Sequence, residues 1–393
     1  MMSVSRQLRL LYIVSAGYWA ASQMIRPVVA MFLVALGSSP AVVGIVVGIQ
    51  SFVPLFLAIP AGSLADRFGY RRFLALGSLT MAGAGVLYMC AALSHAYVVL
   101  VVAQVIEGLF ELFVWTSAQA YVTQLGRDHD VDHNVAHFSF FSALGQMAGP
   151  ALGGFVAEKL GYTWAFGVFA AMCVGLFVSA CALPEHRPTP VAGGRVSMLS
   201  ASRRIYVNPE VQIGLIGTFA NLFITGMWTS FYPVYLISVG FTPSVSGFLI
   251  ALKGLASLAA RPFVSPIVRR MGHSGALILA SVVAVAPVAA TPLIRNVALL
   301  GLAALASGIG LGLNLPLTIS IIAHNTPPEE RGIGMGLRLV MNRVALLTSP
   351  LIFGFVSEYT GFGQSFYVCS AIVGALMLLA VRRRNLAARR RYN

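Results

Sequence analysis

The sequence predicts an all-α polytopic membrane protein, with twelve transmembrane helices in two pseudo-symmetric bundles of six. Of its 393 residues, 58% are hydrophobic and only 10% are charged, whereas soluble domains carry about 25% charged residues. Apolar runs of ~20 residues recur along the chain, and each is long enough to cross a ~30 Å hydrocarbon layer as a helix. These runs lack the period-two alternation of membrane strands, which excludes a β-barrel.

The twelve spans follow from these runs and from the turn residues between them. Turn signals such as GSSP at 37–40 and GFTP at 240–243 separate neighbouring runs. The predicted spans are 9–35, 41–64, 73–93, 97–124, 135–157, 162–183, 210–238, 243–268, 275–294, 297–322, 333–357 and 362–381.

The distribution of Lys and Arg predicts the orientation. With the N-terminus in the cytoplasm, 19 of the 26 Lys and Arg residues lie in inside segments, and only Lys159 and Arg295 lie in outside loops. Basic residues accumulate on the cytoplasmic side of membrane proteins, so both termini are expected there. The net charge of +14 is therefore interpreted as membrane topology and not as nucleic-acid binding. We expect a monomer in the lipid bilayer of a bacterial inner membrane.

The chain divides at its longest connection and repeats across it. Residues 184–209 are basic and rich in Pro, Gly and Ser, which predicts a cytoplasmic linker between a bundle at 1–183 and one at 210–393 with a basic tail. GSSPAVVG at 37–44 matches GFTPSVSG at 240–247 with an offset of 203, and EKLGYTWAF at 158–166 matches EYTGFGQSF at 358–366 with an offset of 200. Duplicated bundles around a midplane site are typical of secondary transporters.

The segment GSLADRFGYRR at 62–72, between the second and third spans, resembles the cytoplasmic signature GxLaDRxGrr of the major facilitator superfamily. Glycines permit a tight turn, and the acid and arginines can form charge-assisted bonds that hold neighbouring helices together. The resemblance implies a twelve-helix fold and a cytoplasmic gate. In the second half, SPIVRRMGH at 265–273 has Arg269 in place of the acid. The matching residues of the gating motif are Gly62, Asp66, Arg67, Gly69 and Arg71.

The fifth span contains GQMAGPALGG at 145–154, which is similar to the GxxxGPxxGG motif of superfamily members that export by antiport. Small residues three or four positions apart let helices approach closely, and a proline can kink the helix. The alternative interpretation is ordinary helix packing without directional meaning. Ala136 stands where the family more usually has a further glycine. The matching residues are Gly145, Gly149, Pro150, Gly153 and Gly154.

Two glutamates lie inside the fourth span, where each charge at mid-bilayer costs about 2.5–3.5 kcal/mol. Glu107 and Glu111 are four residues apart and share a helical face, which Gln104 and Trp115 extend. Two carboxylates this close in a low-dielectric environment cannot both be ionised cheaply. We therefore expect one to take a proton while Arg26 pairs with the other.

Arg26 lies in the first span on a stripe with Trp19 and Gln23. Many antiporters of the resembled family carry an arginine in the fourth span, three residues before a Gln-Gly pair, but Gln104 occupies that position here. The proton relay associated with that arginine is thus not available. A purely structural ion cluster is the alternative to a proton site.

The second half carries only positive charges in the interiors of its spans. These are Lys253, Arg338 and Arg343, with Asn342 on the same face as Arg338. Positive charge without a carboxylate favours an anionic substrate, although Arg338 could instead extend its side chain to the cytoplasmic surface. Aromatic and amide groups that suit an amphiphilic ligand, or simply pack between helices, are Asn221, Trp228 and Asn314.

Together these features predict a secondary active transporter that works by alternating access and is driven by the proton gradient, without cofactor or metal. An antiporter that exports small amphiphilic or anionic compounds is favoured by the motif of the fifth span. Uptake of an organic anion, such as a carboxylate siderophore or metabolite, is the alternative, and a non-transporting receptor is a third. The sequence contains no GxxxxGK[ST], HExxH or GxSxG motif, so no enzyme is expected.

Overall fold

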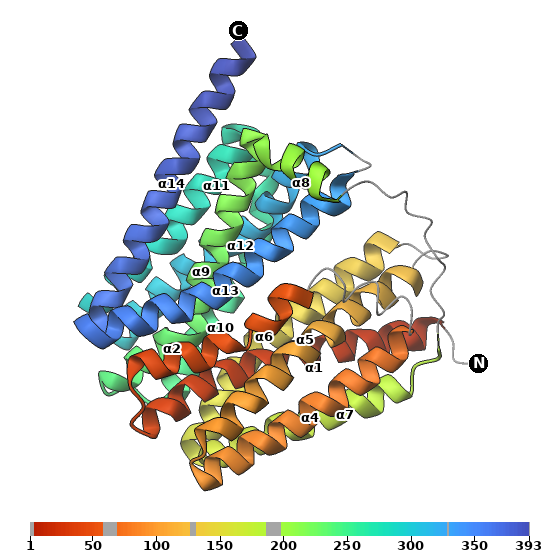
Figure 1. Ribbon diagram of the computed structural model, residues 1–393, viewed down its shortest axis with the longest axis vertical. Helices are drawn as coiled ribbons and strands as arrows, with labels where there is room; N and C mark the ends of the chain where they lie inside the picture. The colour runs from red at the N-terminus through yellow and green to blue at the C-terminus, as the bar shows by residue number, and fades with distance from the viewer. Residues whose placement is uncertain (1–3, 58–68, 126–130, 186–197, 328–329, 393) are drawn as a thin grey trace. The chain divides into compact units, whose positions relative to one another are not determined.

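The computed structural model describes residues 4–57, 69–125, 131–185, 198–327 and 330–392, and all regular structure in these ranges is helical (Figure 1). In the first part of the chain the helices are α1 (Val4–Ala35), α2 (Pro40–Ile49), α4 (Tyr70–Ser94), α5 (Tyr97–Leu125), α6 (Val131–Lys159) and α7 (Tyr162–Cys181). They are followed by α8 (Met198–Val207), α9 (Pro209–Ser238), α10 (Pro243–Ala260), η2 (Arg261–Phe263), α11 (Val264–Ala290), η3 (Thr291–Leu293), α12 (Val297–His324), α13 (Arg331–Thr360) and α14 (Phe362–Tyr392).

Residues 58–64 of the second predicted span lie outside the described residues, and the other predicted spans fall on described helices. Among the described residues, eleven segments are long and apolar enough to cross a membrane, and one of them, Pro243–Leu293, has 51 residues. A straight helix of that length would measure about 75 Å, more than twice the hydrocarbon thickness. Gly272 adopts φ 69 within it and interrupts the helix, so this segment contains both the eighth and the ninth predicted spans. The all-α polytopic fold is confirmed.

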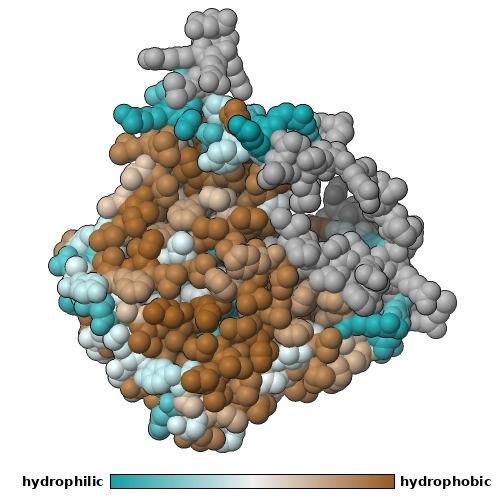
Figure 2. Space-filling view, viewed as in Figure 1, coloured by the Kyte–Doolittle hydropathy of each residue, from teal (hydrophilic) through white to brown (hydrophobic). Residues whose placement is uncertain are grey.

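Large hydrophobic side chains cover the outside of the helices. Phe56, Leu93 and Val98 are 66–76% exposed, and hydrophobic residues form most of the face seen in Figure 2, with hydrophilic residues toward its edges. A soluble monomer rarely exposes so large an apolar surface. In a bilayer the same surface contacts lipid, and the helices satisfy their own backbone hydrogen bonds.

One compact unit comprises Met1–Ala192 together with Tyr232–Ala251. Within it α1 packs along α6, and α4 packs between α5 and α7 (Figure 1). Glycines set the close approach of α1 to α6, because a Cβ atom on Gly145 or Gly149 would collide with the carbonyl oxygen of Ala16 or Ala20. The small residues of the fifth span therefore act as helix-packing residues.

The same unit contains a close contact between α6 and the start of α10. A Cβ atom on Gly154 would collide with the carbonyl oxygen of Pro243, and one on Gly247 with that of Pro150. Beside this crossing, the backbone N–H of Ser244 donates to Glu158 Oε2 at 3.1 Å. A carboxylate at a helix N-terminus is favourable because the first N–H groups have no partner within the helix.

The other compact unit comprises Gly193–Phe231 and Leu252–Asn393. In it α11 packs against α12 and α14. Residues 198–207, within the predicted linker, form the helix α8, which contacts α13. Arg204 of α8 forms an ion pair with Glu330 at the start of α13. The division of the chain into bundles at 1–183 and 210–393 stays a prediction.

Candidate functional site

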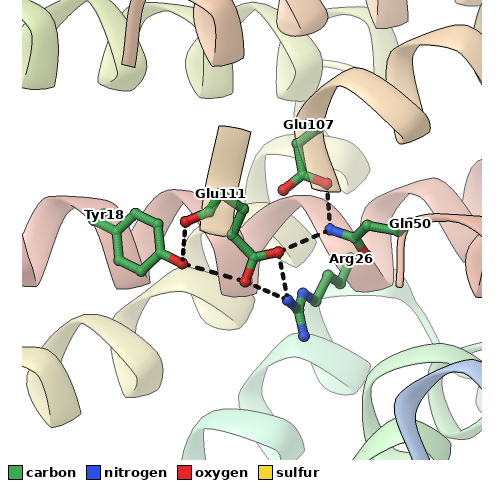
Figure 3. Close-up of polar contacts among 5 residues, drawn as sticks. All are labelled: Tyr18, Arg26, Gln50, Glu107 and Glu111. Carbon is green, nitrogen blue, oxygen red and sulfur yellow. Dashed lines mark hydrogen bonds and ion pairs between the residues drawn. The ribbon is translucent and has the colours of Figure 1, made fainter. Parts of the chain in front are cut away.

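The helix α5 places two carboxylates side by side in the protein interior (Figure 3). Glu107 is 0% exposed and Glu111 is 4% exposed. Gly108 lies between them, and a Cβ atom there would collide with the carbonyl oxygen of Gln50. This glycine therefore brings the backbone at the end of α2 against α5, within reach of both acids.

Arg26 of α1 pairs with the second of these acids. Its Nη2 atom lies 2.7 Å from Glu111 Oε1 and 2.8 Å from Oε2, and the Tyr18 hydroxyl donates to Oε1 at 3.2 Å. Charge-assisted hydrogen bonds of this length are among the stronger ones in proteins. The predicted pairing of Arg26 with one of the two acids therefore falls on Glu111.

Gln50 joins the two carboxylates (Figure 3). Its Nε2 donates to Glu107 Oε2 and also lies 3.5 Å from Glu111 Oε2. If all three ionisable groups were charged, Arg26, Glu107 and Glu111 would hold one net negative charge. In a low-dielectric interior such an excess is costly, and one proton on the cluster removes it.

Three aromatic rings pack together beside the acid cluster. The rings of Trp19 and Trp115 are 4.9 Å apart in an edge-to-face arrangement, and the ring of Tyr18 stacks on Trp115 at 5.6 Å. Trp19 and Trp115 are both part-exposed. Gln23 and Gln104, from the same predicted faces, are 8% and 2% exposed.

The second unit holds a cation beside an aromatic ring. Lys253 of α10 is 7% exposed, and its Nζ lies 5.5 Å from the ring centroid of Trp228. The indole Nε1 of Trp228 donates to Ser307 Oγ at 3.0 Å, and Ser307 donates to the carbonyl oxygen of Ala284 at 2.9 Å. The ring is thus held in place by α12 and α11.

The other predicted residues of this half are distributed along α9, α12 and α13. Arg338 is 6% exposed and its Nε lies 3.4 Å from Thr318 Oγ1. Asn314 is fully buried and donates to Ser281 Oγ at 2.9 Å, so it packs between helices. Asn221 is 6% exposed, and two residues are part-exposed, Asn342 and Arg343.

A family model described as Major Facilitator Superfamily matches residues 11–306 and, again, 215–391. The chain belongs to the major facilitator superfamily. It is therefore a multi-pass membrane protein and a secondary transporter of small molecules, and its family is one of transporters and not of enzymes. The family resemblance predicted from the gating motif and the motif of the fifth span is confirmed.

Named relatives of this transporter are distant. It is 25% identical to the multidrug resistance protein MdtG of Klebsiella pneumoniae over 81% of this chain and 78% of the relative. It is 21% identical to the staphylopine export protein of Staphylococcus aureus over 94% of both. Among solved structures, the nucleoside transporter NupG superposes with a TM-score of 0.80 at 13% identity, covering 97% of this chain and 99% of that one. This last likeness shows the fold alone.

The family motifs are described only in part. Gly62, Asp66 and Arg67 of the gating motif lie outside the described residues. Gly69 adopts φ 95, a backbone conformation that favours glycine, and Arg71 donates to the carbonyl oxygen of Cys181 at 2.9 Å. In the fifth span, a Cβ atom on Gly153 would lie 2.8 Å from the Met24 side chain, which extends the packing of α6 on α1.

Two residues of the acid cluster were not predicted as site residues from the sequence. Tyr18 precedes the predicted Trp19, but its hydroxyl turns to Glu111. Gln50 had an available signal, because it lies 203 positions before Lys253, the offset of the repeat. A polar residue at the same repeat position as a buried lysine could have been added to the candidate site.

Proposed function

We propose that this transporter is a proton-coupled antiporter that exports small amphiphilic or anionic compounds by alternating access. The observation that carries the proposal is the buried cluster of two carboxylates and one guanidinium, joined by Gln50. Intramembrane acids commonly mark ion or substrate paths. A cluster with one excess acid favours binding of one proton, which is the requirement for a proton-driven carrier.

Within the cluster, we assign the exchangeable proton to Glu107. Arg26 stabilises the ionised form of Glu111 through contacts to both carboxylate oxygens. Glu107 accepts a hydrogen bond from the Gln50 amide, and a neutral donor compensates a full negative charge less than the bidentate guanidinium contact at Glu111 does. Loss of the proton from Glu107 leaves a net negative cluster, and this state is relieved by a new proton or by a bound cationic group.

The direction of transport rests on two supports. The motif of the fifth span is similar to that of exporting antiporters, and the relatives include a multidrug resistance protein and a staphylopine export protein. Uptake of an organic anion is the second candidate, favoured by the buried cations Lys253 and Arg338. A deletion strain that becomes drug-sensitive supports export, whereas loss of growth on one nutrient or iron source supports uptake.

The setting proposed for this activity is the inner membrane of a bacterium. The excess of Lys and Arg in the alternate loops supports a cytoplasmic location of both termini. We further propose that the transporter works as a monomer, that residues 1–183 and 210–393 move as two bundles, and that the gating motif around Asp66 and Arg67 stabilises one state of the cycle.

The coupling role is tested with Glu107→Gln and Glu111→Gln in proteoliposomes. Candidate substrates are first chosen from cationic drugs and organic anions that raise the unfolding temperature of the purified protein. A trapped pH dye then reports proton flux when a substrate is added under an imposed pH gradient. We expect Glu107→Gln to abolish substrate-dependent proton flux. The matched control is Glu358→Gln, because Glu358 is an exposed glutamate on α13, outside the acid cluster and the gating motif. Full coupling in both cluster variants would remove the proposal.

A further inference from the structure

Lys253 carries a cation that is buried within the second unit. Lys253 is 7% exposed. No carboxylate forms an ion pair with it in the part of the chain that the structure describes. Its only charge-compensating contact there is the face of the Trp228 ring at 5.5 Å. An ammonium inside a membrane protein is costly unless it is paired, so its position requires a reason beyond packing.

The repeat shows what kind of position this is. A Cβ atom on Gly108 would collide with the carbonyl oxygen of Gln50, and one on Gly308 with that of Lys253. Gly108 and Gly308 are 200 residues apart, while Gln50 and Lys253 are 203 apart, which are the two offsets of the sequence repeat. Lys253 therefore occupies, in its own unit, the position from which Gln50 bridges the acid cluster.

The partner residue has changed along with it. At the position equivalent to Glu107, 200 residues later, the chain has Ser307, whose hydroxyl is used by Trp228 and by the carbonyl oxygen of Ala284. The first repeat thus has a neutral amide facing carboxylates, and the second has an ammonium facing an indole whose N–H is bound by the Ser307 hydroxyl. An anionic ligand can supply the counter-ion for Lys253 that the described residues do not provide.

We propose that Lys253 binds a carboxylate of the transported compound. This inference rests on the proposed transport function and names the substrate class. A single ammonium matches a monoanion, and Ser307 holds the buried Trp228 ring beside that ammonium. Lys253 is then a substrate-binding residue in the second unit, while the proton is bound in the first.

The first test needs no ligand. Lys253→Met keeps the length and apolar stem of the side chain and removes the uncompensated charge. If Lys253 serves binding, the ligand-free variant unfolds at a higher temperature than the wild type, because a site built for a ligand is strained without it. A purely structural lysine gives the opposite result, and a clear fall in unfolding temperature for Lys253→Met would overturn the proposal.

The second test measures ligand class. Purified wild type, Lys253→Met and Lys253→Arg are screened by thermal unfolding against aromatic and aliphatic carboxylates, each paired with its own amide. We expect at least one carboxylate to stabilise the wild type with an apparent affinity ten or more times that of its amide. The preference should disappear in Lys253→Met and persist in Lys253→Arg. A panel in which no carboxylate exceeds its amide, or a preference that survives in Lys253→Met, contradicts the inference.

This assay separates the inference from the proposed function. Binding is measured in detergent without a pH gradient, so it does not depend on coupling through Glu107. A Glu107→Gln protein that keeps the carboxylate preference but loses proton flux supports both statements. A carboxylate preference together with full proton flux in both Glu107→Gln and Glu111→Gln removes the antiport mechanism alone and leaves the binding site in place.

Discussion

The crossing of α2 with α5 and the crossing of α10 with α12 have the same backbone arrangement and opposite charge. In each, a glycine, Gly108 or Gly308, lies against the carbonyl oxygen of Gln50 or Lys253. The first crossing carries two carboxylates with Arg26 as counter-ion, and the second carries one ammonium next to an indole ring. The two crossings share the glycine contact that shapes them and differ in the ionisable side chains beside it.

The two crossings differ in the groups that compensate the electrostatic cost of their buried charges. The acid cluster is compensated within the protein, by a guanidinium, an amide and a phenol hydroxyl. The ammonium is compensated in part by a ring face, which is worth about 2 kcal/mol or more when the pair is desolvated. The stability of the first crossing should therefore depend on the protein groups that contact its acids. The stability of the second should depend on whether a ligand is bound at Lys253.

The largest expected effect comes from Arg26→Met. This change leaves Glu111 without its counter-ion in the interior, and breaking a buried pair costs about 3–5 kcal/mol. We expect a strong fall in unfolding temperature, measured on purified protein. The double variant Arg26→Met with Glu111→Leu should recover most of that loss. A double variant no better than the single one would show that the pair is not the source of the stability.

The next effect tests whether the two crossings are equivalent in shape. Gly108→Ala and Gly308→Ala each force a Cβ atom against a carbonyl oxygen, and overpacking of this kind costs about 1–3 kcal/mol. We expect similar losses of thermal stability in both. Gly83→Ala is the control, because a Cβ atom there meets nothing within 4 Å. A large loss of stability at one crossing and none at the other would show that the two crossings are not equivalent in shape.

Gln50→Lys converts the first crossing into the chemistry of the second. An ammonium between Glu107 and Glu111 would neutralise the cluster without a bound proton. We expect a folded protein whose substrate-dependent proton flux falls about tenfold, equivalent to roughly 1.4 kcal/mol of lost coupling. The readout is the pH dye in proteoliposomes. Unchanged flux in Gln50→Lys would contradict a proton site at this crossing.

The smallest effect concerns the ring in the second unit. Ser307→Ala removes the acceptor for the Trp228 indole, and an unsatisfied buried donor costs about 1–3 kcal/mol. We expect a loss near the lower end, because the small alanine leaves room for the ring to move. Thermal unfolding measures this loss of stability. The preference for a carboxylate over its amide should weaken in Ser307→Ala, whereas Lys253→Arg retains it. Wild-type stability and wild-type carboxylate preference in Ser307→Ala would show that the Ser307 hydrogen bond is not needed to hold the Trp228 ring in position.

The sequence predicted the fold well, because length and apolar content are enough to identify a membrane span. The structure adds the backbone conformation at Gly272, which interrupts the helical segment that contains the eighth and ninth predicted spans. The helix α8 in the predicted linker was not expected, because its Ser and Arg residues are typical of a solvated connection and its packing on α13 is tertiary.

The site was predicted in part, and the reason lies in helix rotation. A four-residue spacing placed Glu107 and Glu111 on one face, and charge balance pointed to Arg26. The sequence could not choose which acid Arg26 would hold, because that depends on how α1 turns toward α5. Similarly, Asn314 had the composition of a ligand-binding residue, but its amide donates to Ser281 between two helices.

The contact of α6 with α10 has a consequence for the speed of any motion that separates these helices. Gly154 and Gly247 each face a carbonyl oxygen of the other helix, so the surfaces that meet are backbone. Ordering a long side chain costs up to ~2 kcal/mol of conformational entropy, and a glycine has none to order. At these two glycines the helices can part and meet again without a rotamer search, and Glu158 is the side chain that has to find the Ser244 N–H again. Substrate-contacting side chains could diverge during evolution without slowing that step.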